Sequence, residues 1–109
     1  LIGRDTLIHA ALCYGATGAI ASCANVAPRL TADIYDRYMA GDMAGSLEAQ
    51  YRLAPLRIAF NLGSFPEVVK AALEMQGFEV GKSLDPIAEL PPDKKEKLRS
   101  LLVSMEILK

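Results

Sequence analysis

Hydrophobic positions recur at helical spacing in several segments of the chain, and residues that favour helix ends flank these segments. In the first segment, from Asp5 to Gly15, the apolar positions repeat at intervals of three and four: Leu7, Ile8, Ala11 and Leu12. Asp5 is suited to cap the free amides of the first turn, and Gly15 is suited to a left-handed stop. This pattern predicts a helix from Asp5 to Gly15.

The next segment predicts a strand. Residues 18–23 (Gly-Ala-Ile-Ala-Ser-Cys) show no polar alternation, as in strands whose two faces are both covered. They lie in an uncharged run from Thr6 to Pro28, but its small and polar residues and the break at Gly15-Ala16-Thr17-Gly18 argue against a membrane span. The order of helix, tight turn, buried strand and helix is typical of a parallel α/β protein.

Helices dominate the middle of the chain. Pro28 opens a predicted helix that Gly41 ends, and Asp42 caps a longer helix that extends to about Leu62. We expect the longer helix to pack against two neighbours and to bend at Pro55. Its two apolar rows comprise Leu47, Tyr51, Ala54, Ile58 and Leu62, and Leu53, Leu56 and Phe60.

Two more helices are predicted toward the C-terminus. Ser64 and Glu67 form a capping box for a helix that ends at Gly77, and Pro91-Pro92-Asp93 starts the last helix. Between these helices, residues 78–90 show no period, so we expect an extended connection. The last helix carries one apolar stripe: Leu98, Leu101, Leu102, Met105 and Leu108.

Composition limits the function classes. The 109 residues are 51% hydrophobic with a net charge of -1, so we expect a globular domain and neither a disordered chain nor a basic nucleic-acid binder. One His and two Cys are too few for a structural zinc site, and we expect no metal and no other cofactor. The chain starts at Leu1 without a Met or a signal peptide, so we expect it to be part of a longer protein.

A single buried strand cannot form a parallel sheet by itself. Its backbone groups need hydrogen-bonded neighbours on both sides, and only Leu1-Ile2 offers the tail of another strand. We therefore expect the remaining strands to lie upstream of residue 1 or in another chain.

Six segments follow one another along the chain: Gly3-Arg4-Asp5, residues 15–22 (Gly-Ala-Thr-Gly-Ala-Ile-Ala-Ser), Ala24-Asn25-Val26-Ala27-Pro28, Ala40-Gly41-Asp42, Leu53-Ala54-Pro55-Leu56 and Val69-Lys70-Ala71-Ala72-Leu73. This ordered set resembles the C-terminal end of dihydrodipicolinate synthases and of their relatives, the N-acetylneuraminate lyases and 2-keto-3-deoxy sugar-acid aldolases. The resemblance covers essentially the whole chain and is specific for the superfamily rather than for one member.

The resemblance implies an α/β fold, the C-terminal part of a TIM (β/α)₈ barrel. Residues 1–41 would supply the last βα units, from the end of strand seven through helix eight, with residues 18–23 as strand eight. Residues 42–109 would form a C-terminal helical extension. A whole barrel takes about 250 residues, so this chain is well short of one.

The resemblance also implies a chemistry. Such enzymes bind pyruvate, or a 2-keto acid that yields it, as a Schiff base on a strand-six lysine, with a strand-five tyrosine that moves protons. Both residues are expected upstream, so we expect no catalytic residue in this chain. Barrel active sites lie at the C-terminal ends of the strands. The Ile20 carbonyl would face the keto acid, and Gly3 would leave room for it. Asp5 and Thr6 would meet the second substrate, and Ser22 would lie at a comparable rim.

Simpler interpretations stand beside these roles. Asp5 is equally suited as a helix N-cap, and Ser22 as a satisfied hydroxyl of the barrel core. His9 has no nearby ligand partners and is interpreted as a helix-face histidine. If a whole strand separates Cys13 from Cys23, the two are too far apart for a disulfide. We therefore expect both to be reduced and buried, as in a cytoplasmic enzyme.

Two function classes follow. The first is a class I aldolase or lyase that forms or breaks a carbon–carbon bond next to a 2-keto acid, of which this chain alone is an inactive C-terminal portion. Its expected partners are pyruvate, an aldehyde, the upstream part of the barrel and further copies in a homotetramer, without nucleic acid or membrane. The second is a non-catalytic helical module that uses the apolar rows of residues 42–62 for assembly.

Overall fold

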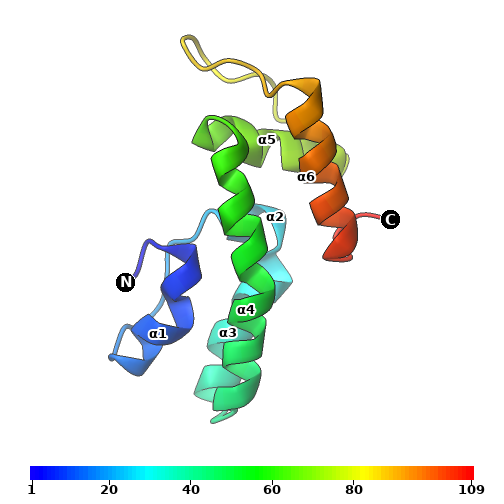
Figure 1. The fold of residues 1–109 in the computed structure, drawn as a ribbon. Coiled ribbons are helices and arrows are strands. Elements are labelled where there is room, and N and C mark those ends of the chain that lie inside the picture. Colours follow the sequence, from blue (N-terminus) through cyan, green and yellow to red (C-terminus); the bar gives the residue numbers. More distant parts are fainter. The chain divides into compact units, whose positions relative to one another are not determined.

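The computed structural model describes residues 1–109 and consists mainly of helices (Figure 1). In chain order the elements are η1 (Asp5–Leu7), α1 (Ile8–Cys13), α2 (Cys23–Val26), α3 (Pro28–Met39), α4 (Met43–Ala59), η2 (Phe60–Leu62), α5 (Phe65–Met75) and α6 (Pro92–Ser104). None of the helices is both long and apolar enough to cross a membrane. The chain forms two compact units, Leu1–Arg57 and Ile58–Lys109, and each is described by itself.

The helix ends follow the local chemistry of the sequence. Gly15, Gly41 and Gly77 lie just beyond α1, α3 and α5 with φ values of 95°, 81° and 97°, a region that glycine enters without strain. Pro28 is the first residue of α3. The Asp42 carboxylate caps α4 by accepting the amide of the third helical residue at 2.9 Å. The predicted ends of these helices are confirmed, and α4 continues through Pro55.

The prediction of a buried strand over residues 18–23 is wrong. A single parallel bridge forms between Ile2 and Ala19, in which the Ile2 amide donates to the Gly18 carbonyl at 3.1 Å and the Ile20 amide donates to the Ile2 carbonyl at 3.0 Å. The Ile20 side chain is 73% exposed, and α2 already begins at Cys23. A longer strand needs paired neighbours along both edges, and here the short N-terminal segment pairs along one edge only.

In the first unit, α1 and α2 pack on α3, and α4 is joined to α1 and α3 by hydrogen bonds. Leu53 and Leu56 of α4 are fully buried. The helix contacts two neighbours, α1 and α3, as predicted, but Leu47 and Tyr51 of its other apolar row are 37% and 68% exposed. Side chains of α4 bond to α1 and α3 on its buried side.

In the second unit, α5 packs against η2 and α6. The buried Phe60 ring meets the Phe65 ring edge to face, with centroids 5.7 Å apart. The predicted start of the last helix is confirmed, since α6 begins at Pro92, and Leu98 and Leu102 of the predicted stripe are buried. The stripe is shorter than predicted, because α6 ends at Ser104, before Met105 and Leu108. The connection over residues 78–90 has no regular secondary structure, as predicted.

The capping box predicted at the start of α5 is wrong. The Ser64 side chain makes no capping bond, and the Glu67 carboxylate accepts a hydrogen bond from the Ser83 hydroxyl at 2.5 Å. Glu67 is buried. Its carboxylate therefore bonds to the connection over residues 78–90 instead of turning back to Ser64.

Candidate functional site

The five residues predicted to line a substrate site lie on two neighbouring stretches of the first unit. Residues 3–6 follow Ile2 and residues 20–22 follow Ala19, and these two residues form the parallel bridge. A hydrogen bond between Asp5 and Cys23 joins the stretches again at their far ends. The structure therefore brings the predicted residues side by side.

Asp5 lies inside this arrangement. Its side chain is 2% exposed, and its Oδ2 accepts the Cys23 amide at 2.7 Å. The carboxylate makes no capping bond to its own helix, so the N-cap interpretation is wrong for α1. Instead it accepts a hydrogen bond from the first amide of α2, and a negative charge is favourable at the N-terminus of a helix. Asp5 thus holds the two stretches together.

The other four residues are less buried. Gly3 faces open space, since a Cβ added there would have no neighbour within 4 Å. The Ile20 carbonyl accepts no hydrogen bond within the chain. Thr6 and Ser22 are half-buried, and the Ser22 carbonyl accepts the Asn25 amide as α2 begins. An open backbone carbonyl beside a glycine is an arrangement that can receive a small polar ligand.

Cys23 is fully buried next to Asp5. Burial raises the pKa of the Cys23 thiol well above its ordinary value of 9.0, and the neighbouring Asp5 carboxylate raises it further. The thiol is therefore protonated and unreactive in the folded protein. Both cysteines are free, as predicted, but only Cys23 is buried, so the expectation of a buried Cys13 is wrong.

This thiol makes stability depend on pH. The unfolded chain releases the Cys23 proton above the ordinary thiol pKa and the folded chain keeps it, so stability is complete at lower pH and falls as pH rises. We expect an extra loss of up to about 1.4 kcal/mol per pH unit between about pH 9 and about pH 11, compared with Cys23→Ala. Urea unfolding of both proteins across this range measures the difference, and parallel pH profiles would contradict it.

Two polar residues of α4, Ser46 and Gln50, support the N-terminal stretch, and neither was predicted from the sequence. Gln50 is 5% exposed, donates through Nε2 to the Asp5 carbonyl at 2.9 Å and accepts the His9 amide on Oε1 at 2.9 Å. Ser46, one turn earlier, lies 2.8 Å from His9 Nδ1. Their spacing of four on the face of Leu53 is the signal that could have identified them.

Comparison with known proteins identifies the family of the chain. The sequence model of the Dihydrodipicolinate synthetase family matches residues 1–105. The chain belongs to this family. This membership confirms the resemblance inferred from the ordered segments.

Relatives of the chain in this family are longer than it is. The 4-hydroxy-tetrahydrodipicolinate synthases of Archaeoglobus fulgidus and Methanothrix thermoacetophila are 35% and 38% identical over 108 residues, which cover 99% of this chain and 37% of each relative. A crystal structure of YagE, a prophage protein of E. coli K12 in complex with pyruvate, matches with a TM-score of 0.91 and 27% identity over 98% of this chain and 37% of YagE. The chain therefore spans little more than a third of the length of these relatives.

The lysines of this family member all belong to the second unit, Ile58–Lys109, whereas the five predicted residues belong to the first. Lys70 donates to the Lys82 carbonyl at 3.1 Å, and Lys82 pairs with Glu89 at 3.1 Å on the exposed surface of the second unit. The remaining lysines belong to α6 or the C-terminus: Lys94, Lys95, Lys97 and Lys109. The structure contains no group of three or more His, Cys, Asp or Glu side chains that could hold a metal ion.

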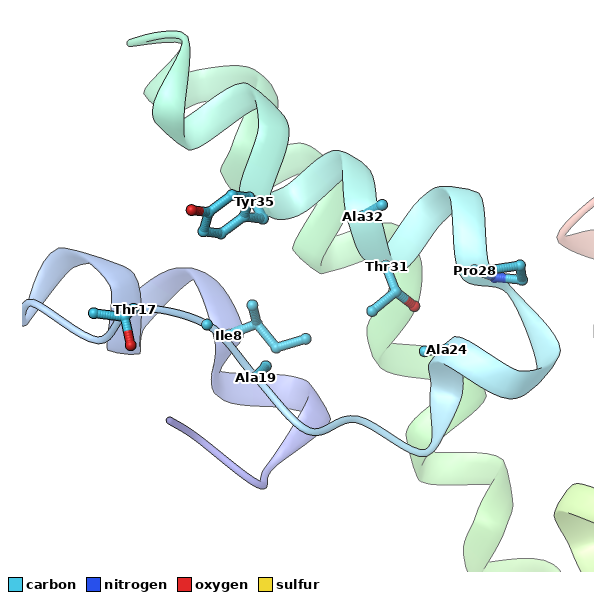
Figure 2. A pocket seen from close by; sticks show the side chains of 9 residues that line it. Ile8, Thr17, Ala19, Ala24, Pro28, Thr31, Ala32 and Tyr35 are labelled. Atoms are coloured by element: carbon cyan, nitrogen blue, oxygen red, sulfur yellow. The ribbon is translucent and has the colours of Figure 1, made fainter.

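A pocket of about 370 Å³ lies elsewhere in the first unit (Figure 2). Tyr35 and Thr31 of α3 border it on one side, and Ile8 of α1 and residues 17–19 border it on the other. Its lining is mostly apolar, and none of the five predicted residues belongs to it. The pocket is therefore distinct from the candidate site.

Proposed function

We propose that this chain is the C-terminal portion of a pyruvate-dependent Schiff-base lyase that forms or breaks a carbon–carbon bond next to a 2-keto acid. The family match over residues 1–105 carries this proposal. The relatives named as 4-hydroxy-tetrahydrodipicolinate synthases and the pyruvate complex of YagE support the reaction class and the keto acid.

In this proposal, residues 1–41 are the last βα units of a TIM barrel and residues 42–109 are a helical extension. Residues 18–23 form no strand within this chain, but the parallel bridge between Ile2 and Ala19 is the kind of pairing that joins successive βα units of such a barrel, and it supports this assignment. The exposed Ile20 side chain is then covered by barrel residues that this chain does not contain. Further copies in a homotetramer belong to the same proposal and rest on the resemblance alone.

The five residues have distinct roles in this function. The open carbonyl of Ile20 and the space beside Gly3 receive the keto acid. Thr6 and Ser22, which are half-buried, contact the second substrate, an aldehyde. Asp5 positions both stretches from within, because its buried carboxylate is already bonded to the Cys23 amide.

The Schiff-base lysine of this function lies outside the chain. A lysine forms a Schiff base readily where desolvation lowers its pKa, so that the amine is neutral. Lys82 is 84% exposed in a surface ion pair, and Lys70 bonds to a carbonyl of the 78–90 connection, which are poor settings for that chemistry.

Borohydride trapping tests the proposal. We expect the intact protein, incubated with pyruvate and sodium borohydride, to carry one reduced pyruvate adduct on a lysine that is absent from residues 1–109. Peptide mapping by mass spectrometry locates the adduct, and protein treated with borohydride alone is the control. An intact protein without an adduct, or with its adduct on Lys70 or Lys82, would overturn the assignment.

A further inference from the structure

Three side chains that do not belong to the five predicted site residues form a continuous line of hydrogen bonds across α1, α4 and α3. Cys13 Sγ lies 3.6 Å from His9 Nε2, and His9 Nδ1 lies 2.8 Å from Ser46 Oγ. The Ser46 hydroxyl donates to the Ile34 carbonyl at 2.7 Å. The line therefore runs from an exposed thiol to a carbonyl inside the first unit.

The last of these bonds fixes the direction of the others. A serine hydroxyl has one hydrogen, and Ser46 gives it to the Ile34 carbonyl, so its oxygen accepts from His9 Nδ1–H. Neutral imidazole carries one hydrogen, which leaves a lone pair on His9 Nε2. That lone pair faces the Cys13 thiol and is the acceptor for its proton.

The imidazole is held in place from several sides. Ser46 is fully buried, and the Tyr38 ring meets the His9 ring edge to face with centroids 6.1 Å apart. Gln50 accepts the His9 backbone amide. Cys13, at the end of α1, is exposed. A nucleophile, a base and a third group that orients the base are the parts that activate a thiol.

We propose that Cys13 is a modification site for alkylating carbon electrophiles, with His9 as the base that assists its reaction. In the step, the thiol sulfur forms a bond to the electrophilic carbon while the leaving group departs with its electron pair. The S–H bond breaks, its proton moves to His9 Nε2, and the imidazolium then releases a proton to solvent. The proposal stands independently of the proposed lyase activity.

Iodoacetamide labelling of the intact protein at neutral pH tests the assignment. We expect His9→Gln to slow the labelling of Cys13 by roughly 10- to 100-fold, at or below the lower end of general-base assistance. Ser46→Ala, which removes the group that orients the ring, is expected to have a smaller effect in the same direction. Tyr14→Phe is the matched control, because Tyr14 is exposed next to Cys13 and lies outside the line of bonds. Peptide mapping follows each cysteine separately.

Two further measurements separate base assistance from a structural effect. Free imidazole added to the buffer is expected to restore part of the Cys13 rate in His9→Ala and to leave the wild-type rate unchanged. Cys23 is buried, so its labelling reports unfolding, and rates are compared only for protein in which Cys23 stays unlabelled. Equal Cys13 rates in the wild type and His9→Gln, or no rescue by imidazole, would show an ordinary exposed cysteine and overturn the proposal.

Discussion

Replacement of Asp5 by Ala is expected to lower the free energy of unfolding of the first unit by about 2 to 3 kcal/mol. The carboxylate is 2% exposed and accepts the Cys23 amide at 2.7 Å, and Cys23 is itself fully buried. Without the carboxylate, this amide has no partner and no access to water. A buried donor left unpaired costs about 1–3 kcal/mol, and the lost bond to a charged acceptor lies at the upper end of this range.

Asp5→Asn is the matched control for this prediction. Asparagine has nearly the same shape and keeps a carbonyl oxygen as acceptor, so we expect it to lose less stability than Asp5→Ala. Urea unfolding of the wild type and both variants measures the difference. Equal losses in the two variants would show that the hydrogen bond to Cys23 is not the source of the effect.

The helix limits of this protein could be predicted because they depend on neighbouring residues. Gly41 ends α3 and Asp42 caps α4 through contacts that span no more than a few residues. The capping box at Ser64 failed because a distant residue, Ser83, offers the buried Glu67 carboxylate its partner. Neighbouring residues therefore identify a helix end, except where a side chain of the helix end is buried against a segment far away in the sequence.

The prediction of a strand over residues 18–23 was wrong for a related reason. Its apolar composition is typical of a buried strand, but a strand forms only where other strands complete its hydrogen bonds. Within the chain, only the pairing of Ile2 with Ala19 is available. With this single pairing, the segment forms only a short bridge, and the Ile20 side chain stays 73% exposed.

The residues of the candidate site were predicted from the family resemblance alone. The order of segments pointed to Gly3 and Ile20, and the structure places their stretches side by side. The buried polar residues of α4 were missed, because a Gln or Ser in a helix has the same sequence signature whether it faces water or a neighbouring helix. The partners of Gln50 lie 41 and 45 residues earlier in the chain, so only tertiary structure reveals them.

Gln50→Leu is expected to lower the free energy of unfolding of the first unit by about 2 to 5 kcal/mol, because one buried and one partly buried backbone group lose their partners, each at a cost of up to about 3 kcal/mol. One group is the Asp5 carbonyl and the other is the His9 amide, which belongs to the first turn of α1. Such amides have no partner within their helix, and no side chain at the start of α1 caps them. Gln50 therefore caps α1 from a different helix.

Gln50→Glu separates the two bonds. Glutamate keeps an acceptor for the His9 amide but presents a carboxylate to the Asp5 carbonyl, so it removes one bond and retains the other. At neutral pH the buried carboxylate also repels the Asp5 carbonyl oxygen, so we expect urea unfolding to show a variant at least as unstable as Gln50→Leu. At low pH the protonated side chain can donate to that carbonyl, so we expect Gln50→Glu to be more stable than Gln50→Leu there. If the proposed function holds, both variants displace the stretch that carries Thr6 and raise the KM for the aldehyde, while pyruvate is still trapped by borohydride. A glutamate variant that is as unstable as the leucine variant at low pH as well would mean that these two bonds do not support this stretch.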